Sequence, residues 1–250
     1  MLAVTVLGCS GSYAEPGGAC TGYLVQSSGA RVWLDAGPGT LANLQDSCRL
    51  TELDAVVITH AHPDHWLELP VVANALEWYE TRDPLPVYSN AHTEAAAREL
   101  IGEPIDRIFA WRVVDTSDKV TIGDQTWSFA ETEHYIPTYA TRTDAEGHTL
   151  VFSSDTGPGF SLRSLYDGDE IIDLAIVEST FLDREGHAGA LHLAAPEAGT
   201  MAQEGLVARL LLTHQAPFED RQAHADAAAA NFSGDIVLAE VGRLYAAASS

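Results

Sequence analysis

The sequence has few cysteines and no paired cysteine motif. Its 250 residues include three cysteines, Cys9, Cys20 and Cys48, and no two of them form a CxxC pair. Small disulfide-stabilised folds carry an even set of cysteines, and structural zinc sites normally recruit them. Both classes are therefore disfavoured, and the sparse cysteines predict a cytoplasmic protein.

Positive charge is also scarce. Lys119 is the only lysine, and 13 Lys and Arg stand against 36 Asp and Glu, a formal net charge of −23. Binding along a nucleic-acid backbone needs a basic surface that displaces counterions. We therefore expect no extended nucleic-acid binding.

Long hydrophobic runs are missing as well. No apolar stretch is long enough to cross a bilayer, so no membrane association is expected. The opening "MLAVTVLGCSGS" has no basic residues and predicts a strand rather than a signal peptide. With 46% hydrophobic and 20% charged residues, the chain predicts a packed core, in a single domain of residues 1–250.

Short apolar runs bounded by glycine predict strands in both halves of the chain, with helices between them. This order favours two sheets packed face to face and covered by helices. An apolar face on the helix predicted over His65–Glu80 could serve a homodimer contact. The predicted strands are Leu2–Leu7, Gly22–Gln26, Arg31–Leu34, Ala55–Ile58, Val113–Val114, Val120–Ile122, Thr126–Glu131, Thr149–Ser153, Leu174–Val177, Arg209–Leu212 and Ile236–Leu238, and the other helices Thr93–Leu100, Pro196–Glu204 and Arg221–Ala230.

Histidine is concentrated after one predicted strand, in "THAHPDHWLEL". His60 and His62 are two residues apart, so in an extended segment they point the same way, and Asp64 and His65 follow at the turn into a helix. Imidazole and carboxylate are suitable ligands for zinc and related first-row metals. The cluster has no cysteine and too many ligands for one tetrahedral ion, so it indicates two ions that share a water molecule.

Further ligands are expected directly after other strands. Three residues have this placement: His134, Asp155 in "VFSSDTG", and His214 in "LLLTH". Side chains at strand ends can converge on a shared cleft, so these residues complete the predicted site. His92, His148 and His224 have no such placement and are expected to be exposed to solvent.

These motifs, with "LGCSGS" and "LDAGPG", give a sequence that resembles the metallo-β-lactamase-fold hydrolases over nearly its whole length. The resemblance implies an α/β fold, a four-layer αβ/βα sandwich of two mixed β-sheets with outer helices. It also implies that Asp35 anchors the metal loop by hydrogen bonds. It assigns His60, His62 and His134 to one ion, Asp64, His65 and His214 to the other, and Asp155 to both.

The order of the later motifs resembles the ribonuclease Z-like branch, and particularly its small actinobacterial members described as cyclic-nucleotide phosphodiesterases. In that branch an acid and a following histidine assist phosphoester cleavage, and Glu178 and His192 match them here. His187 is the rival for the histidine role. Glu178 could instead be a buried acid paired with Arg142, which is itself a candidate phosphate contact.

The resemblance therefore implies a binuclear metal-dependent hydrolase in which Asp64, Glu178 and His192 are catalytic. A hydroxide bound by two divalent ions, zinc or alternatively manganese or iron, would attack a small phosphodiester such as a cyclic nucleotide. The long basic arm that tRNA-processing members use to hold tRNA has no counterpart in this sequence. The alternatives are hydrolysis of carboxylic esters, lactones or thioesters on the same centre, or tRNA 3′-end processing.

Overall fold

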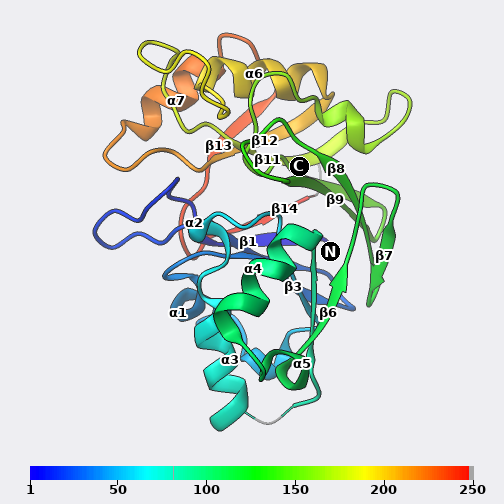
Figure 1. The fold of residues 1–250 in the computed structure, drawn as a ribbon. Helices are drawn as coiled ribbons and strands as arrows, with labels where there is room; N and C mark the ends of the chain where they lie inside the picture. The colour runs from blue at the N-terminus through cyan, green and yellow to red at the C-terminus, as the bar shows by residue number, and fades with distance from the viewer. Residues whose placement is uncertain (81, 248–250) are drawn as a thin grey trace.

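The computed structural model describes residues 1–80 and 82–247 and contains two seven-stranded β-sheets that pack face to face (Figure 1). Helices cover the outer face of each sheet, which confirms the predicted four-layer sandwich. Residues 81 and 248–250 of the predicted single domain, residues 1–250, lie outside the described residues.

The first sheet combines antiparallel and parallel pairing. Its order is β14-β1-β2-β3-β4-β5-β6, with antiparallel neighbours from β14 to β3 and parallel neighbours from β3 to β6. Its strands are β1 (Ala3–Gly8), β2 (Gly22–Gln26), β3 (Arg31–Ala36), β4 (Ala55–Val57), β5 (Leu85–Ser89), β6 (Phe109–Val113) and β14 (Leu244–Ala246).

The second sheet has the same mixture in the order β13-β12-β11-β10-β9-β8-β7. Here β13 to β10 are parallel neighbours and β10 to β7 are antiparallel. Its strands are β7 (Lys119–Ile122), β8 (Gln125–Glu131), β9 (Tyr139–Ala145), β10 (His148–Phe152), β11 (Ile172–Glu178), β12 (Val207–Thr213) and β13 (Asp235–Leu238).

The helices lie outside the sheets, with α6 and α7 over the second sheet (Figure 1). Two of them begin at side-chain caps: Asn90 accepts a hydrogen bond from Thr93 N at the start of α4, and Asp220 caps α7. The helices are α1 (Thr40–Leu44), α2 (Pro63–Trp66), α3 (Leu69–Trp78), α4 (Ala91–Ile101), α5 (Ile105–Ile108), α6 (Ala195–Glu204) and α7 (Arg221–Ala228), with 3₁₀ turns η1 (Leu50–Glu52) and η2 (Leu162–Leu165).

Both faces of each sheet are apolar because one packs on the other sheet and one on helices. In β3, Val32 and Leu34 belong to the core between the sheets, whereas Trp33 packs with the helices of the first sheet. All three side chains are fully buried, and each contributes about 1.5–3 kcal/mol by leaving water. The resulting rigid sheets fix the loops that leave their carboxyl ends.

Those carboxyl ends meet at one edge of the sandwich. β3 and β4 run parallel in the first sheet, and β10, β11 and β12 run parallel in the second. β8 has the direction of β10, because both are antiparallel to β9. In sheets of this kind, ligands bind beyond the carboxyl ends of the strands.

The helix predicted over His65–Glu80 is in fact two helices, α2 and α3. Pro70 has no N–H to donate to the carbonyl four residues earlier, so a continuous helix cannot pass through it. Glu68 N donates instead to Ala36 O at 3.0 Å. His65 therefore lies in a short helix of its own at the end of the strand.

Several strand predictions were incomplete. Sequence patterns missed β9, in which Thr141 and Thr143 occupy buried positions that an apolar pattern would fill. They also missed β5, whose prolines suggested only a helix break, and β14, so Ile236–Leu238 is not the last strand. The strand predicted at Val113–Val114 is the end of β6, which begins at Phe109.

Candidate metal centre

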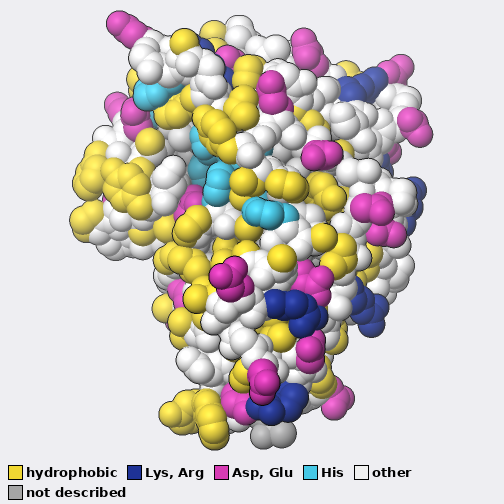
Figure 2. Space-filling model, viewed as in Figure 1, with side chains coloured by type: hydrophobic (Ala, Val, Ile, Leu, Met, Phe, Trp, Pro, Cys, Tyr) yellow, Lys and Arg dark blue, Asp and Glu magenta, His cyan; other side chains and the backbone are white. Residues whose placement is uncertain are grey.

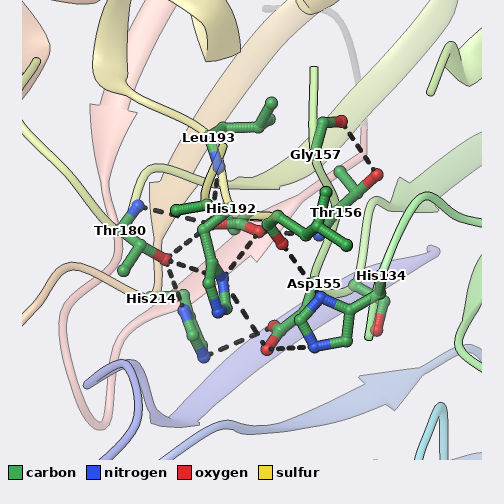
Figure 3. A network of polar contacts seen from close by, with 12 residues as sticks. His134, Asp155, Thr156, Gly157, Thr180, His192, Leu193 and His214 are labelled. Carbon is green, nitrogen blue, oxygen red and sulfur yellow. Dashed lines mark hydrogen bonds and ion pairs between the residues drawn. The ribbon is translucent and has the colours of Figure 1, made fainter. Parts of the chain in front are cut away.

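Seven side chains predicted as metal ligands converge at this edge. They form two neighbouring clusters in which the candidate ligand atoms all lie within 4.8 Å of one another. Cluster 1 is His60, His62, His134 and Asp155, and cluster 2 is Asp64, His65 and His214. Figure 3 shows Asp155 close to His134, His192 and His214.

The distances in cluster 1 suit a single small cation. His134 Nε2 lies 3.0 Å from His62 Nδ1, and Asp155 Oδ2 lies 3.6 Å from His60 Nε2 and 3.8 Å from His134 Nε2. Four ligands arranged tetrahedrally about 2.0–2.1 Å from zinc are separated from one another by about 3.3 Å. The atoms of cluster 1 are spaced close to that value.

Cluster 2 has similar spacing. His65 Nε2 and His214 Nε2 are 3.3 Å apart, and Asp64 Oδ2 lies 3.6 and 3.3 Å from them. The other oxygen of Asp155, Oδ1, lies 3.2 Å from His65 Nε2 and 3.4 Å from His214 Nε2. Asp155 thus presents one carboxylate oxygen to each cluster.

Hydrogen bonds outside the clusters leave ring lone pairs directed inward. His65 Nδ1 donates to the Asp35 carboxylate at 2.7 Å, and His134 Nδ1 donates to the carbonyl of Leu191 at 2.9 Å. Both partners only accept, so in the neutral rings Nε2 carries a free lone pair. The short nitrogen–nitrogen contacts are therefore better explained as ligand–ligand spacings than as hydrogen bonds.

Two orphaned atoms support the same interpretation. His60 Nε2 and Asp155 Oδ1 are buried and have no hydrogen-bond partner among the described residues. A buried polar atom without a partner costs about 1–3 kcal/mol, so such atoms are rare. A divalent cation would satisfy both, and nitrogen and carboxylate donors are the ligands that zinc accepts, so these residues fit a metal centre.

The pKa values indicate a site built for positive charge. Burial and the charge of His65 hold the pKa of His60 well below its usual value, which keeps the ring neutral. Burial opposes ionisation of Asp155, but His214 and His65 outweigh it and keep its pKa well below normal. Burial lowers the pKa of His65, yet Asp155, Asp64 and Asp35 together raise it well above normal. The carboxylates therefore attract a cation, and a metal would displace a proton from His65.

The loops that carry these residues contain strained backbone. Asp35, Ser154 and His214 adopt left-handed conformations, with φ of 55°, 53° and 57°. Such conformations cost of order 1–3 kcal/mol each for residues other than glycine and collect at functional sites. Asp35 is the last residue but one of β3, and Ser154 and His214 follow β10 and β12, so each changes the direction of the chain at the end of a strand.

Glycine allows close packing of the metal loop. A Cβ at Gly37 would lie 2.0 Å from the carbonyl oxygen of Asp64, and one at Gly11 would lie 2.5 Å from the carbonyl oxygen of His214. The chain following Gly11 also contacts the site, because Ser12 N donates to Asp64 Oδ2 at 2.9 Å. "LGCSGS" and "LDAGPG" thus hold cluster 2 in place.

Asp35 lies where the resemblance placed it, under the metal loop. Its carboxylate is fully buried and accepts from Thr59 N at 2.8 Å as well as from His65. It therefore connects the end of β3 to the segment after β4.

Glu178 and His192 lie together beside Asp155. Glu178 is fully buried at the end of β11, and His192 Nδ1 donates to Glu178 Oε1 at 3.1 Å. Burial lowers the pKa of His192, but the Glu178 carboxylate outweighs it and raises the pKa to about 9. His192 Nδ1 is also 3.9 Å from Asp155 Oδ2, so this pair adjoins the metal ligands.

The rival residues lie elsewhere. His187 is exposed and stacks on Phe181, with ring centroids 3.9 Å apart. Arg142 does not pair with Glu178, because its guanidinium is bonded to Asp144 and Glu170. The alternative of a buried Glu178–Arg142 pair is therefore wrong.

Sequence reasoning missed several supporting residues. Arg184 donates to the carbonyls of Ala190 at 3.0 Å and His192 at 2.5 Å and also pairs with Glu197, so it organises the His192 loop. Thr59 and Thr180 lie within two residues of motif residues in the sequence, which is the signal that could identify them. The expectation that His224 is exposed is wrong, because it is fully buried against Ser179.

The surface around the site carries little positive charge. Histidine side chains reach the surface between hydrophobic ones on the face shown in Figure 2, and Lys and Arg lie apart from them. Helix α3 ends in exposed aromatic side chains, with Trp78 73% and Tyr79 87% exposed. No helix among the described residues has the length and hydropathy needed to cross a membrane.

Comparison with known proteins gives consistent similarities. A family model described as a beta-lactamase superfamily domain matches residues 30–215. The chain is 28% identical to the probable metallo-hydrolase YhfI of Bacillus subtilis, over 97% of this chain and 98% of that protein. The crystal structure of YhfI superposes with a TM-score of 0.86, covering 98% of this chain and all of the other.

Two further relatives cover most of the chain. It is 31% identical to the uncharacterized protein Rv1339 of Mycobacterium tuberculosis, over 93% of this chain and 88% of that protein. It is 27% identical to a ribonuclease Z of Bradyrhizobium diazoefficiens, over 91% and 94% of the two chains.

Proposed function

Because this chain belongs to the beta-lactamase superfamily and is a metal-dependent hydrolase, we propose that it cleaves small phosphodiesters such as cyclic nucleotides. The observation that carries the proposal is the Glu178–His192 pair beside Asp155. A charged donor next to a metal centre suits an anionic substrate and a leaving oxygen that needs a proton. The ribonuclease Z relative, a nuclease by name, is consistent with this bond type.

The proposed metal ligands are those of the two clusters. His60, His62 and His134 would hold one divalent ion, and Asp64, His65 and His214 the other, with Asp155 shared between them. We propose zinc, with manganese and iron as the alternatives that accept the same donors. When bound, such a pair supplies an activated water and stabilises charge on the phosphate.

The protein side chains would then orient the nucleophile and donate a proton to the departing oxygen. Asp64, held by Ser12 N, fixes the direction from which a nucleophile approaches. Glu178 accepts from His192 Nδ1, which leaves His192 Nε2 to donate to the departing oxygen or to hold a phosphate oxygen. Such positioned proton transfer contributes about 10²- to 10⁴-fold to a rate.

The proposed substrate is small because the sequence has no counterpart of the long basic arm with which tRNA-processing members hold tRNA. Arg184, which contacts the His192 carbonyl, is occupied by Glu197 and by backbone carbonyls. The net charge of −23 opposes docking of a polyanion. Small phosphodiesters need no such surface. A homodimer formed through α3 remains a proposal.

The test compares substrates on one metal-loaded preparation. Bis(p-nitrophenyl) phosphate, a cyclic nucleotide, a lactone and a thioester are assayed with wild-type protein and with His62→Ala, which should abolish metal-dependent turnover. Dominant phosphodiester turnover supports the proposal. Turnover confined to the lactone or thioester would overturn the substrate class, and cleavage of precursor tRNA in preference to cyclic nucleotides would favour the tRNA-processing alternative.

A further inference from the structure

Two buried threonine hydroxyls link carboxylates to ligand histidines. Thr59 Oγ1 lies 2.8 Å from Asp35 Oδ2 and 3.1 Å from His60 Nδ1. Thr180 Oγ1 lies 2.5 Å from Glu178 Oε2 and 2.9 Å from His214 Nδ1. Each threonine thus lies between a carboxylate and a proposed ligand histidine. The histidine that contacts Thr59 belongs to cluster 1, and that of Thr180 belongs to cluster 2.

The direction of each hydrogen bond follows from the number of protons. A threonine hydroxyl has one proton to donate and two lone pairs, and an ionised carboxylate only accepts. The proton of Thr59 is therefore used on Asp35, and that of Thr180 on Glu178. Each hydroxyl can then only accept from the neighbouring histidine, which places a proton on Nδ1 of His60 and of His214.

This arrangement leaves Nε2 of both rings as the free lone pair. His60 Nε2 is a buried atom without a partner, and His214 Nε2 lies among Asp64, His65 and Asp155. These are the nitrogens that face the proposed metals. A ring with its proton on Nε2 would present an N–H to the ion and could not bind it.

The two hydrogen-bonded relays, Asp35–Thr59–His60 and Glu178–Thr180–His214, occupy corresponding places in the two sheets. Asp35 is the last residue but one of β3 and Thr59 follows β4 in the first sheet, whereas Glu178 ends β11 and Thr180 follows it in the second. All four are at least 97% buried, so water does not compete for these hydrogen bonds. The position of each threonine, between a carboxylate and a histidine, allows it to fix the proton on Nδ1 of that histidine.

We propose that Thr59 and Thr180 are positioning residues, each of which sets the ring tautomer of one ligand histidine and thereby the metal affinity of one cluster. Thr59 acts on His60 in cluster 1, and Thr180 acts on His214 in cluster 2. The inference rests on the proposed ligand set but is independent of the substrate.

The relays differ in one respect. Thr180 Oγ1 also lies 3.3 Å from His192 Nδ1, so it contacts the proposed catalytic histidine as well as a ligand. Thr59 has no such contact among its described hydrogen bonds. Glu178 consequently supports both His192, directly, and His214, through Thr180.

The experiment is a zinc titration by calorimetry of Thr59→Val and Thr180→Val, which keep the side-chain shape but remove the hydroxyl. Loss of an outer hydrogen-bond partner weakens metal binding about 10- to 100-fold. Each variant should show this loss at one of the two binding events, a different one in each variant, while the other event keeps its wild-type affinity. Thr59→Ser and Thr180→Ser, which retain the hydroxyl, should restore both affinities.

Two further measurements separate tautomer control from packing. Thr143→Val is the matched control, because Thr143 is fully buried and its hydroxyl has no partner among the described residues. It should leave both zinc affinities unchanged. Nuclear magnetic resonance of ring ¹⁵N nuclei in zinc-loaded protein should show the Nδ1–H signal of His214 altered in Thr180→Val and that of His60 altered in Thr59→Val.

Three results would overturn the proposal. The first is wild-type zinc affinity at both events in the two valine variants. The second is failure of the serine variants to restore binding, which would assign the effect to packing. The third is an unchanged Nδ1–H signal in a variant that has lost zinc affinity.

Discussion

The two sheets contribute to the metal centre in different ways. The first sheet supplies four proposed ligands from one segment, residues 60–65, which follows a single strand. The second sheet supplies His134, Asp155 and His214 from the ends of three strands, together with Glu178 and His192. The first half is encoded locally, whereas the second exists only when the strands of its sheet are in register.

The two halves of the metal centre should therefore respond differently to substitution. A change in the first half acts through a short loop that is held by Asp35 and by glycine contacts. A change in the second half acts on one member of a dispersed set whose members share hydrogen bonds. Substitutions at a residue shared by both halves, or at a residue of one half only, should therefore differ in their effects on turnover, metal binding and stability.

The largest effect is expected from Asp155→Ala, which removes the residue shared by both halves. Its carboxylate lies within 3.8 Å of His60, His65, His134 and His214, so both clusters lose a donor. Turnover should fall at least about 1,000-fold, because the metals supply several kcal/mol of transition-state stabilisation. Metal content should fall with it, as measured by elemental analysis.

Asp173→Ala is the control for this change. Asp173 lies on β11 near the opposite end from the site and contacts His148. It should keep wild-type turnover and metal content. Full metal content in Asp155→Ala would show that Asp155 is not a shared ligand.

The second largest effect is expected from His192→Ala, which changes only the second half. Turnover of the phosphodiester should fall about 10²- to 10⁴-fold, the usual contribution of a positioned proton donor. Metal content should stay at the wild-type value, because His192 is outside the proposed ligand set. His187→Ala is the matched control and should retain turnover, since His187 stacks on Phe181 at the surface. Equal losses in both variants would contradict the choice of His192.

A moderate effect is expected from Gly37→Ala, which disturbs only the first half. The added Cβ would overlap the Asp64 carbonyl, so the metal loop must shift, at a cost of about 1–3 kcal/mol in the free energy of unfolding. Metal affinity should fall as well. Gly189→Ala tests the specificity of this effect: alanine is strained there by the φ of +78°, but its Cβ meets no atom within 4 Å, so metal affinity should be unchanged. Unchanged metal affinity in Gly37→Ala would show that the loop can relax.

The smallest effect is expected from His224→Gln, beneath the second half. Burial lowers the pKa of His224 below 6.5, so the folded state binds fewer protons than the unfolded state just below that pH. Stability is therefore lost as the pH falls from about 6.5 through the folded-state pKa. The variant should lose less stability than wild type between about pH 7 and pH 5, measured by urea unfolding. A variant whose pH dependence is indistinguishable from that of wild type would show that His224 does not contribute.

Sequence patterns predicted the architecture well because apolar strands and turn residues are local signals. The segment from His60 to His65 stood out for the same reason. His134, Asp155 and His214 were found because each lies within three residues of the end of a strand, a rule that works when strands share an edge. The structure brings them together as expected, and metal titration is the test of their role.

The remaining features depend on contacts that no local pattern records. Pro70 divides the helix predicted over His65–Glu80, and buried Thr141 and Thr143 concealed β9. The burial of His224 arises from packing against Ser179. The role inferred for Thr180 depends on its contact with His214, which is 34 positions further along the chain. The sequence alone does not place these two residues side by side.

Each cluster takes donors from both sheets, and this has a consequence for the lifetime of the protein in a cell. An ion bound by His60 and His134 would cross-link distant parts of the chain, and so would one bound by His65 and His214. A ligand that binds only the folded state adds about 2.7 kcal/mol of stability at one hundred times its dissociation constant. Cellular proteases degrade the unfolded fraction, so metal starvation would reduce the abundance of the protein as well as its activity.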